Sequence, residues 1–119
     1  MDIWKHGRWV DAWSVVHFLS GFFIALLFYT IGFSVLLTML CTLAALILWE
    51  IYEWLLGILE TPYNVATDIV LGALGAGGAL YLYFFRGQSL PEWLLLLLFF
   101  FMLFLSVWGF WDQYKNGYR

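Results

Sequence analysis

Charged residues are scarce in this chain of 119 residues. Lys, Arg, Asp and Glu make up 11% of the sequence, hydrophobic residues make up 65%, and the mean hydropathy is +0.90. A soluble domain carries about 25% charged residues. The net charge of −3 is small, and no run of Lys or Arg points to a nucleic-acid partner. The composition therefore excludes a soluble domain and predicts an integral membrane protein.

Cysteine is also nearly lacking. Cys41 is the single cysteine, which excludes an internal disulfide and a cysteine-rich metal site. The opening residues, Met1 to Lys5, do not follow the basic-then-apolar order of a cleaved signal peptide. We therefore expect the first apolar run to be retained as a spanning helix.

Long apolar runs are what the sequence has in abundance. Four of them are long enough to cross about 30 Å of hydrocarbon, which takes roughly 20 helical residues. They predict helices over about residues 12–32, 33–57, 62–85 and 90–111. We predict an all-α fold: one transmembrane domain over residues 1–119, a four-transmembrane-helix bundle with short loops.

Several helix boundaries carry local signals. Thr61-Pro62 offers an N-cap followed by proline at the first helical position. Ser89-x-x-Glu92 has the spacing of a capping box. Gly57 and Gly87 lie where the second and third helices are expected to stop.

The basic residues set the expected orientation. Lys5 and Arg8 precede the first helix, Lys115 and Arg119 follow the fourth, and Arg86 alone lies in a loop on the other side. Because four spans return the chain to its starting side, the positive-inside rule predicts that both termini are cytoplasmic, in the plasma (inner) membrane. Residues 1–11 are a candidate interfacial helix.

A small set of polar residues lies inside the predicted spans. At a rise of 1.5 Å per residue, the histidine and the three carboxylates of this set lie about 6 to 10 Å from the cytoplasmic ends of their helices. Three helices thus present polar groups to one layer. The set, with two supporting polar residues, is His17, Glu50, Glu53 and Asp68, supported by Asn64 and Ser14.

The charge balance of this layer is uneven. Three carboxylates accompany one histidine, and no Lys or Arg lies inside a predicted span. An ionised carboxylate in apolar surroundings costs several kcal/mol, so it pairs, takes a proton or binds a cation. The long side chain of Arg8 or Lys5 can reach in from the interface and neutralise one of these carboxylates by forming an ion pair. At least one more carboxylate therefore needs a proton, water, a metal ion or a cationic ligand.

Two chemistries suit this constellation. Carboxylate oxygens from Glu50, Glu53 and Asp68 with a nitrogen from His17 suit a divalent metal, Mg²⁺, Mn²⁺ or Zn²⁺. Alternatively, the same groups can load and unload a proton. Beyond the layer the inner helices offer only Thr38, Cys41 and Thr42 as polar groups. This favours a one-sided pocket over a continuous pore.

The polar positions also resemble a known family. His17-Phe18-x-x-Gly21, Glu53 and Asp68-x-x-x-Gly72-x-x-Gly75 resemble the VanZ-like and YjdF-like group of small bacterial membrane proteins, over roughly residues 11–80. The Glu-Ile-Tyr-Glu-Trp segment from Glu50 is closer to the YjdF type. The chain departs from the VanZ-like pattern at Leu56, where a glutamine is usual, at Gly72, where an asparagine is usual, and by lacking a loop arginine.

This resemblance implies a site at His17, Glu53 and Asp68 and a link with the cell envelope and glycopeptide-antibiotic resistance. Three hypotheses follow. The first is a metal-dependent membrane hydrolase acting on a lipid or lipid-linked headgroup, with His17, Glu53 and Asp68 as catalytic groups and Glu50 as a further metal ligand. The second is a binding or transport module for a proton, a cation or a small amphiphile, working as a homo-oligomer. The third is a structural accessory subunit whose polar cluster fixes helix pairing.

Overall fold

The part of the chain that the structure describes contains four helices that are each long and apolar enough to cross a membrane. The computed structural model describes residues 12–57 and 61–116, and within these ranges it contains no β-strand. The helices are α1 (Trp13–Thr30), α2 (Val35–Leu55), α3 (Pro62–Leu80), which continues into a π-helical turn η1 (Tyr81–Phe85), and α4 (Glu92–Asn116). The predicted all-α, four-helix architecture is confirmed.

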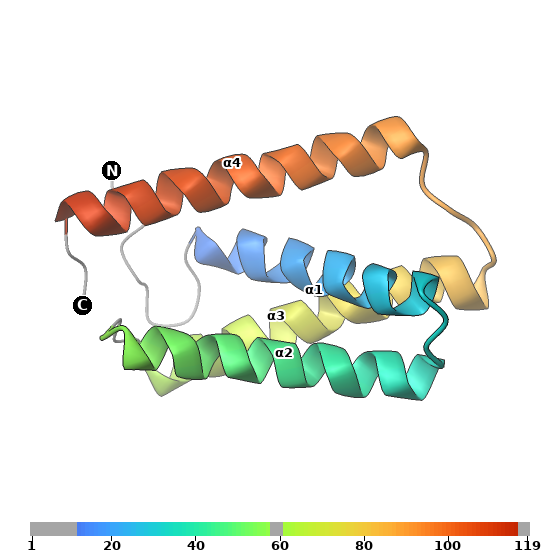
Figure 1. Cartoon of the computed structure of the whole chain (residues 1–119), viewed down its shortest axis with the longest axis horizontal. Coiled ribbons are helices and arrows are strands. Elements are labelled where there is room, and N and C mark those ends of the chain that lie inside the picture. Colours follow the sequence, from blue (N-terminus) through green and yellow to red (C-terminus); the bar gives the residue numbers. More distant parts are fainter. Residues whose placement is uncertain (1–11, 58–60, 117–119) are drawn as a thin grey trace.

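Successive helices run antiparallel, so α1 and α3 begin at the end of the bundle where α2 and α4 finish (Figure 1). Helix α1 contacts each of the other three helices, and its principal partner is α3. In the apolar stretch of α1, 39% of the residues are buried inside the protein, compared with 11% in α4. Helix α1 is therefore the central helix, and α4 is peripheral.

Glycine allows α1 and α3 to approach backbone to backbone. A Cβ atom at Gly21 would overlap the carbonyl oxygen of Gly72, and one at Gly75 would overlap the carbonyl oxygen of Phe18. Small residues at such crossings are the usual means of close helix packing in membranes. On α3, Gly72 also borders the side chain of Leu46, which brings α2 against the same pair. The contact fixes the relative height of the three helices that carry the polar residues.

Helix α4 is attached to α1 mainly through aromatic side chains. Trp13 and Phe110 meet edge to face with ring centroids 5.1 Å apart, and Phe23 and Phe99 do so at 5.5 Å. Such pairs contribute about 0.5–1.5 kcal/mol beyond the area they bury. The two contacts lie ten residues apart on α1, so they hold α4 at two levels, and Met102 and Leu105 of α4 pack against Trp13 and Val16 between them.

The first loop differs from the prediction. Helix α1 ends at Thr30 and α2 begins at Val35, whereas the apolar runs predicted helices meeting at residues 32 and 33. Gly32 has a φ of +106°, which ends the helical path, and Ser34 caps α2 by accepting a hydrogen bond from the Leu37 N–H. Hydrophobicity alone does not reveal this loop, because a glycine turn and a serine cap act locally inside a continuous apolar run.

The predicted boundaries of α3 are confirmed, and those of α4 are shifted. Gly57 and Gly87 both have positive φ values, 82° and 63°. Helix α4 begins at Glu92 rather than residue 90, because its helical hydrogen bonds start at the Pro91 carbonyl, which accepts from the Leu95 N–H (3.1 Å). It then continues to Asn116, beyond the predicted end at residue 111.

Thr61 begins α3 as its N-cap, and its side chain accepts a hydrogen bond from the Asn64 N–H (3.1 Å). We expect Thr61→Ala to lower the free energy of unfolding by about 1 kcal/mol. Thr67→Ala is the matched control, because the Thr67 hydroxyl only donates back to the Tyr63 carbonyl within the helix. Thermal unfolding in detergent checks this, and equal losses in both variants would contradict it.

Some predicted features lie outside the described residues. These are the interfacial helix over residues 1–11, the basic residues Lys5, Arg8 and Arg119, and the loop carboxylate of Glu60.

Candidate functional site

Three helices bring a histidine and two carboxylates together. The His17 Nε2 atom on α1 lies 3.2 Å from an Asp68 carboxylate oxygen on α3 and 4.0 Å from a Glu50 carboxylate oxygen on α2. One donor atom from each residue can be chosen so that all three lie within 4.8 Å of one another. The side chains are 7%, 10% and 0% exposed for His17, Glu50 and Asp68. Three of the side chains that were predicted to lie at one depth are therefore close together in space.

The other predicted residues lie on the same three helices, each within about one turn of a residue of this group. Glu53 is buried, but it lies about 60° around α2 from Glu50, since three residues fall short of a full turn. Its carboxylate is not among the three that meet, so its role as a metal ligand stays a prediction. Asn64 and Ser14 are both buried, one helical turn from Asp68 and His17 respectively. They form a polar layer around the three donors.

The half of the bundle beyond this layer is packed with apolar side chains. Ala25, Ala76 and Ala79 are almost completely buried, and Phe22, Leu26 and Met39 pack against them. Thr38 and Thr42 are fully buried on α2, and the Thr42 hydroxyl donates to the Thr38 carbonyl oxygen (2.7 Å). Among the described residues, these two threonines are the buried polar side chains of this half, so it offers little polar lining for a water-filled path.

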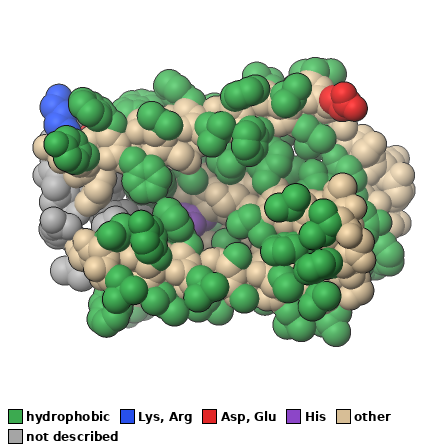
Figure 2. Space-filling model, in the orientation of Figure 1, with side chains coloured by type: hydrophobic (Ala, Val, Ile, Leu, Met, Phe, Trp, Pro, Cys, Tyr) green, Lys and Arg blue, Asp and Glu red, His purple; other side chains and the backbone are tan. Residues whose placement is uncertain are grey.

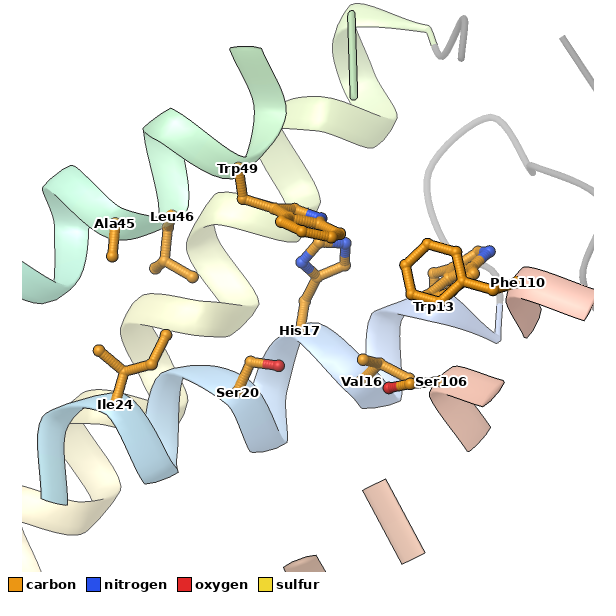
Figure 3. Close-up of a pocket in the computed structure, with 10 residues that line it drawn as sticks. All are labelled: Trp13, Val16, His17, Ser20, Ile24, Ala45, Leu46, Trp49, Ser106 and Phe110. Atoms are coloured by element: carbon orange, nitrogen blue, oxygen red, sulfur yellow. The ribbon is translucent and has the colours of Figure 1, made fainter. Parts of the chain in front are cut away.

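A pocket of about 230 Å³ leads to His17 from the side of the bundle. It lies between α1, α2 and α4, and Figure 3 shows the His17 side chain rising from α1 beside Trp49 of α2. Ser20 and Ser106 supply its hydroxyl groups. The complete lining is Trp13, Val16, His17, Ser20, Ile24, Ala45, Leu46, Trp49, Ser106 and Phe110.

The pocket is partly covered by aromatic rings. Phe110 of α4 contacts both Trp13 of α1 and Trp49 of α2, with centroids 5.1 Å and 6.2 Å apart. In the space-filling view, histidine colour is visible inside a hollow between the upper and lower helices, and acidic colour appears only at one corner (Figure 2). Of the three residues of the cluster, His17 is the one that lines the pocket.

This arrangement has definite chemical capacities. One nitrogen and two carboxylate oxygens match the three-ligand sets of catalytic metal sites, in which a further position takes water or substrate. The same three groups can also share and transfer a proton, since a 3.2 Å contact is within hydrogen-bonding reach. In either case His17 is the member of the cluster that a molecule in the pocket can contact.

Of the residues that line the pocket, the sequence analysis identified His17 as a site residue but not the others. Ser20, Trp49 and Ser106 are single polar or aromatic positions in apolar helices, where packing or interfacial anchoring is the usual role. Helical spacing was the available signal, because Ser20 lies one turn from His17 on α1. Ser106 lies on α4, whose position against α1 no local pattern indicates.

No protein-family model, no curated protein and no solved structure matches this chain.

Proposed function

We propose that this chain is a small metal-dependent membrane hydrolase in which His17, Glu50 and Asp68 hold a divalent cation. The substrate is a lipid or lipid-linked molecule whose headgroup enters the pocket beside His17. The observation that carries the proposal is the meeting of three metal-ligating atoms, one from each of three helices, within 4.8 Å. We further propose that the site lies near the cytoplasmic face of the inner membrane, and that the chain belongs with the VanZ-like and YjdF-like proteins.

The charges of the cluster favour a divalent ion. Glu50 and Asp68 are both shielded from water, and two carboxylates together are costly to keep ionised in apolar surroundings. A doubly charged cation would balance them and leave neutral His17 as a nitrogen ligand. The mixed nitrogen and oxygen donors suit Zn²⁺ or Mn²⁺, and Mg²⁺ is less suited to the imidazole.

The bound ion would supply Lewis acidity and a water of lowered pKa. In the hydrolysis, the water oxygen bonds to the phosphorus or carbonyl carbon, the bond to the leaving oxygen breaks, and that oxygen takes a proton. Glu53 and Asn64 would keep the ligands in place, since partners around metal ligands tune affinity. The aromatic rings of Trp13, Trp49 and Phe110 would limit bulk water in the pocket.

Metal content is the direct test. The purified protein, loaded with Mn²⁺ or Zn²⁺ in detergent and desalted, is expected to retain close to one ion per chain. A Glu50→Gln/Asp68→Asn double variant is expected to retain at least tenfold less, because both anionic ligands become neutral amides. Elemental analysis by mass spectrometry measures both, and headgroup release from lipids in nanodiscs should decline in parallel.

Glu92→Gln is the matched control. Glu92 is an exposed carboxylate at the start of α4, at the opposite end of the bundle from the cluster, so its removal leaves the ion in place. Absence of a retained ion in the wild-type protein would overturn the proposal. Equal metal content in all three proteins would do the same, because the ion would then lie elsewhere.

A proton- or cation-handling module is the second candidate, favoured by the short His17–Asp68 contact of 3.2 Å between helices. Such a module would carry out flux without hydrolysis. In proteoliposomes with an imposed pH gradient, wild-type protein would then dissipate the gradient and Asp68→Asn would not. The packed apolar half described above opposes this reading, since a transported ion needs polar groups along its whole path.

A further inference from the structure

A second hollow follows the seam between α1 and α4. It has a volume of about 570 Å³, within the range of small-molecule sites. Apart from Ser20 and Thr30 its lining is apolar or aromatic. The lining residues include Ser20, Ile24, Leu27 and Thr30 of α1 and Leu96 and Met102 of α4.

This groove adjoins the His17 pocket. Ser20 and Ile24 line both, so the two hollows meet on the same turn of α1. At the junction the Ser20 hydroxyl contacts the Met102 sulfur across the seam (3.7 Å). Methionine is an unbranched, adaptable side chain, and such a contact can shift with little cost. The combined cavity has a polar end, at His17 and Ser106, and a long apolar end.

The dimensions of the groove suit a single hydrocarbon chain. From Ser20 to Thr30 the helix rises about 15 Å, half of a ~30 Å hydrocarbon core. Phe23 and Phe99 contact each other within this stretch and hold α4 against α1. Side chains of both helices therefore form the walls of the groove. Polar groups at one end and apolar walls along the rest are complementary to an amphiphile.

We propose that the α1–α4 groove binds the hydrocarbon chain of a phosphate-bearing membrane lipid whose headgroup occupies the pocket at His17. This inference rests on the proposed function for the headgroup chemistry, since a phosphate is the natural ligand of a cation held beside His17. The tail site itself rests on the groove and its junction with the pocket. The lipid enters sideways from the bilayer, through the face on which the hollow is visible in Figure 2.

Photocrosslinking tests the tail site. The full-length protein is placed in nanodiscs of uncharged lipid with a small fraction of phosphatidic acid carrying a diazirine on its acyl chain. After irradiation, peptide mass spectrometry is expected to find adducts concentrated on groove residues such as Leu27 and Leu96. Leu96→Trp, which fills the groove, is expected to reduce labelling of α1 at least fivefold.

Leu97→Trp is the matched control. Leu96 and Leu97 are neighbours on α4 with nearly equal exposure, 57% and 59%, but only Leu96 lines the groove. Labelling spread evenly over the lipid-facing residues, or reduced equally by both variants, would overturn the tail site. Metal content is measured on the same samples. Groove labelling without bound metal refutes the metal-dependent function alone, and bound metal with even labelling refutes the groove alone.

Discussion

Gly75→Ala is expected to destabilise the bundle by about 1–3 kcal/mol or more through overpacking. The added methyl group would overlap the Phe18 carbonyl oxygen and lie 3.0 Å from the Phe22 nitrogen. Both obstacles are backbone atoms of α1, so neither can move aside as a flexible side chain would. The helices must separate, and the contact between His17 and Asp68 is expected to loosen with them.

Gly77→Ala separates this steric effect from the effect of alanine itself. Gly77 lies on the same helix, and a Cβ atom there would meet nothing within 4 Å. Alanine favours a helix over glycine by about 1 kcal/mol, so Gly77→Ala should be neutral or stabilising. Thermal unfolding in detergent, followed by circular dichroism, compares the two. A Gly75→Ala protein as stable as Gly77→Ala would show that α1 and α3 do not pack backbone to backbone.

Addition of the divalent cation is expected to stabilise wild-type protein by about 2.7 kcal/mol when its concentration is a hundred times the dissociation constant. His17→Ala should lose most of this increment, since it removes the only nitrogen ligand of the three-residue group. The unfolding temperature with and without Mn²⁺ or Zn²⁺ measures the increment in each protein.

The change in unfolding temperature on adding metal is the quantity to compare, because His17→Ala also removes a buried ring and lowers stability in the absence of metal. Ser20→Ala is a suitable control, as Ser20 lines the same pocket but supplies no ligand. An undiminished shift in His17→Ala would contradict the assigned ligand set.

The helices and several of their ends follow directly from the sequence. The length of the apolar runs predicts the four spans. Thr61, Gly57 and Gly87 mark helix ends through local capping and backbone conformation. The common depth of His17, Glu50 and Asp68 needed only the helical rise and the alternation of helix direction. Local chemistry and simple geometry therefore predict that these residues share a layer.

The rotation of each helix and its position beside its neighbours cannot be predicted in this way. Glu50 and Glu53 carry the same side chain at nearly the same depth, and only the rotation of α2 decides which one faces His17. That rotation depends on how Leu46 packs against Gly72, a contact between distant parts of the chain. The groove likewise depends on where α4 lies, and its uniformly apolar sequence does not favour one face for docking.

The peripheral position of α4 has a consequence for biogenesis. Domains form from the N-terminus as the chain is synthesised. Helices α1, α2 and α3 can assemble the His17, Glu50 and Asp68 group before α4 leaves the ribosome, but the pocket and groove need residues of α4 for their walls. The nascent protein would thus form the group of His17, Glu50 and Asp68 first and the pocket and groove last, so a chain interrupted before α4 would lack the proposed lipid-binding cavity.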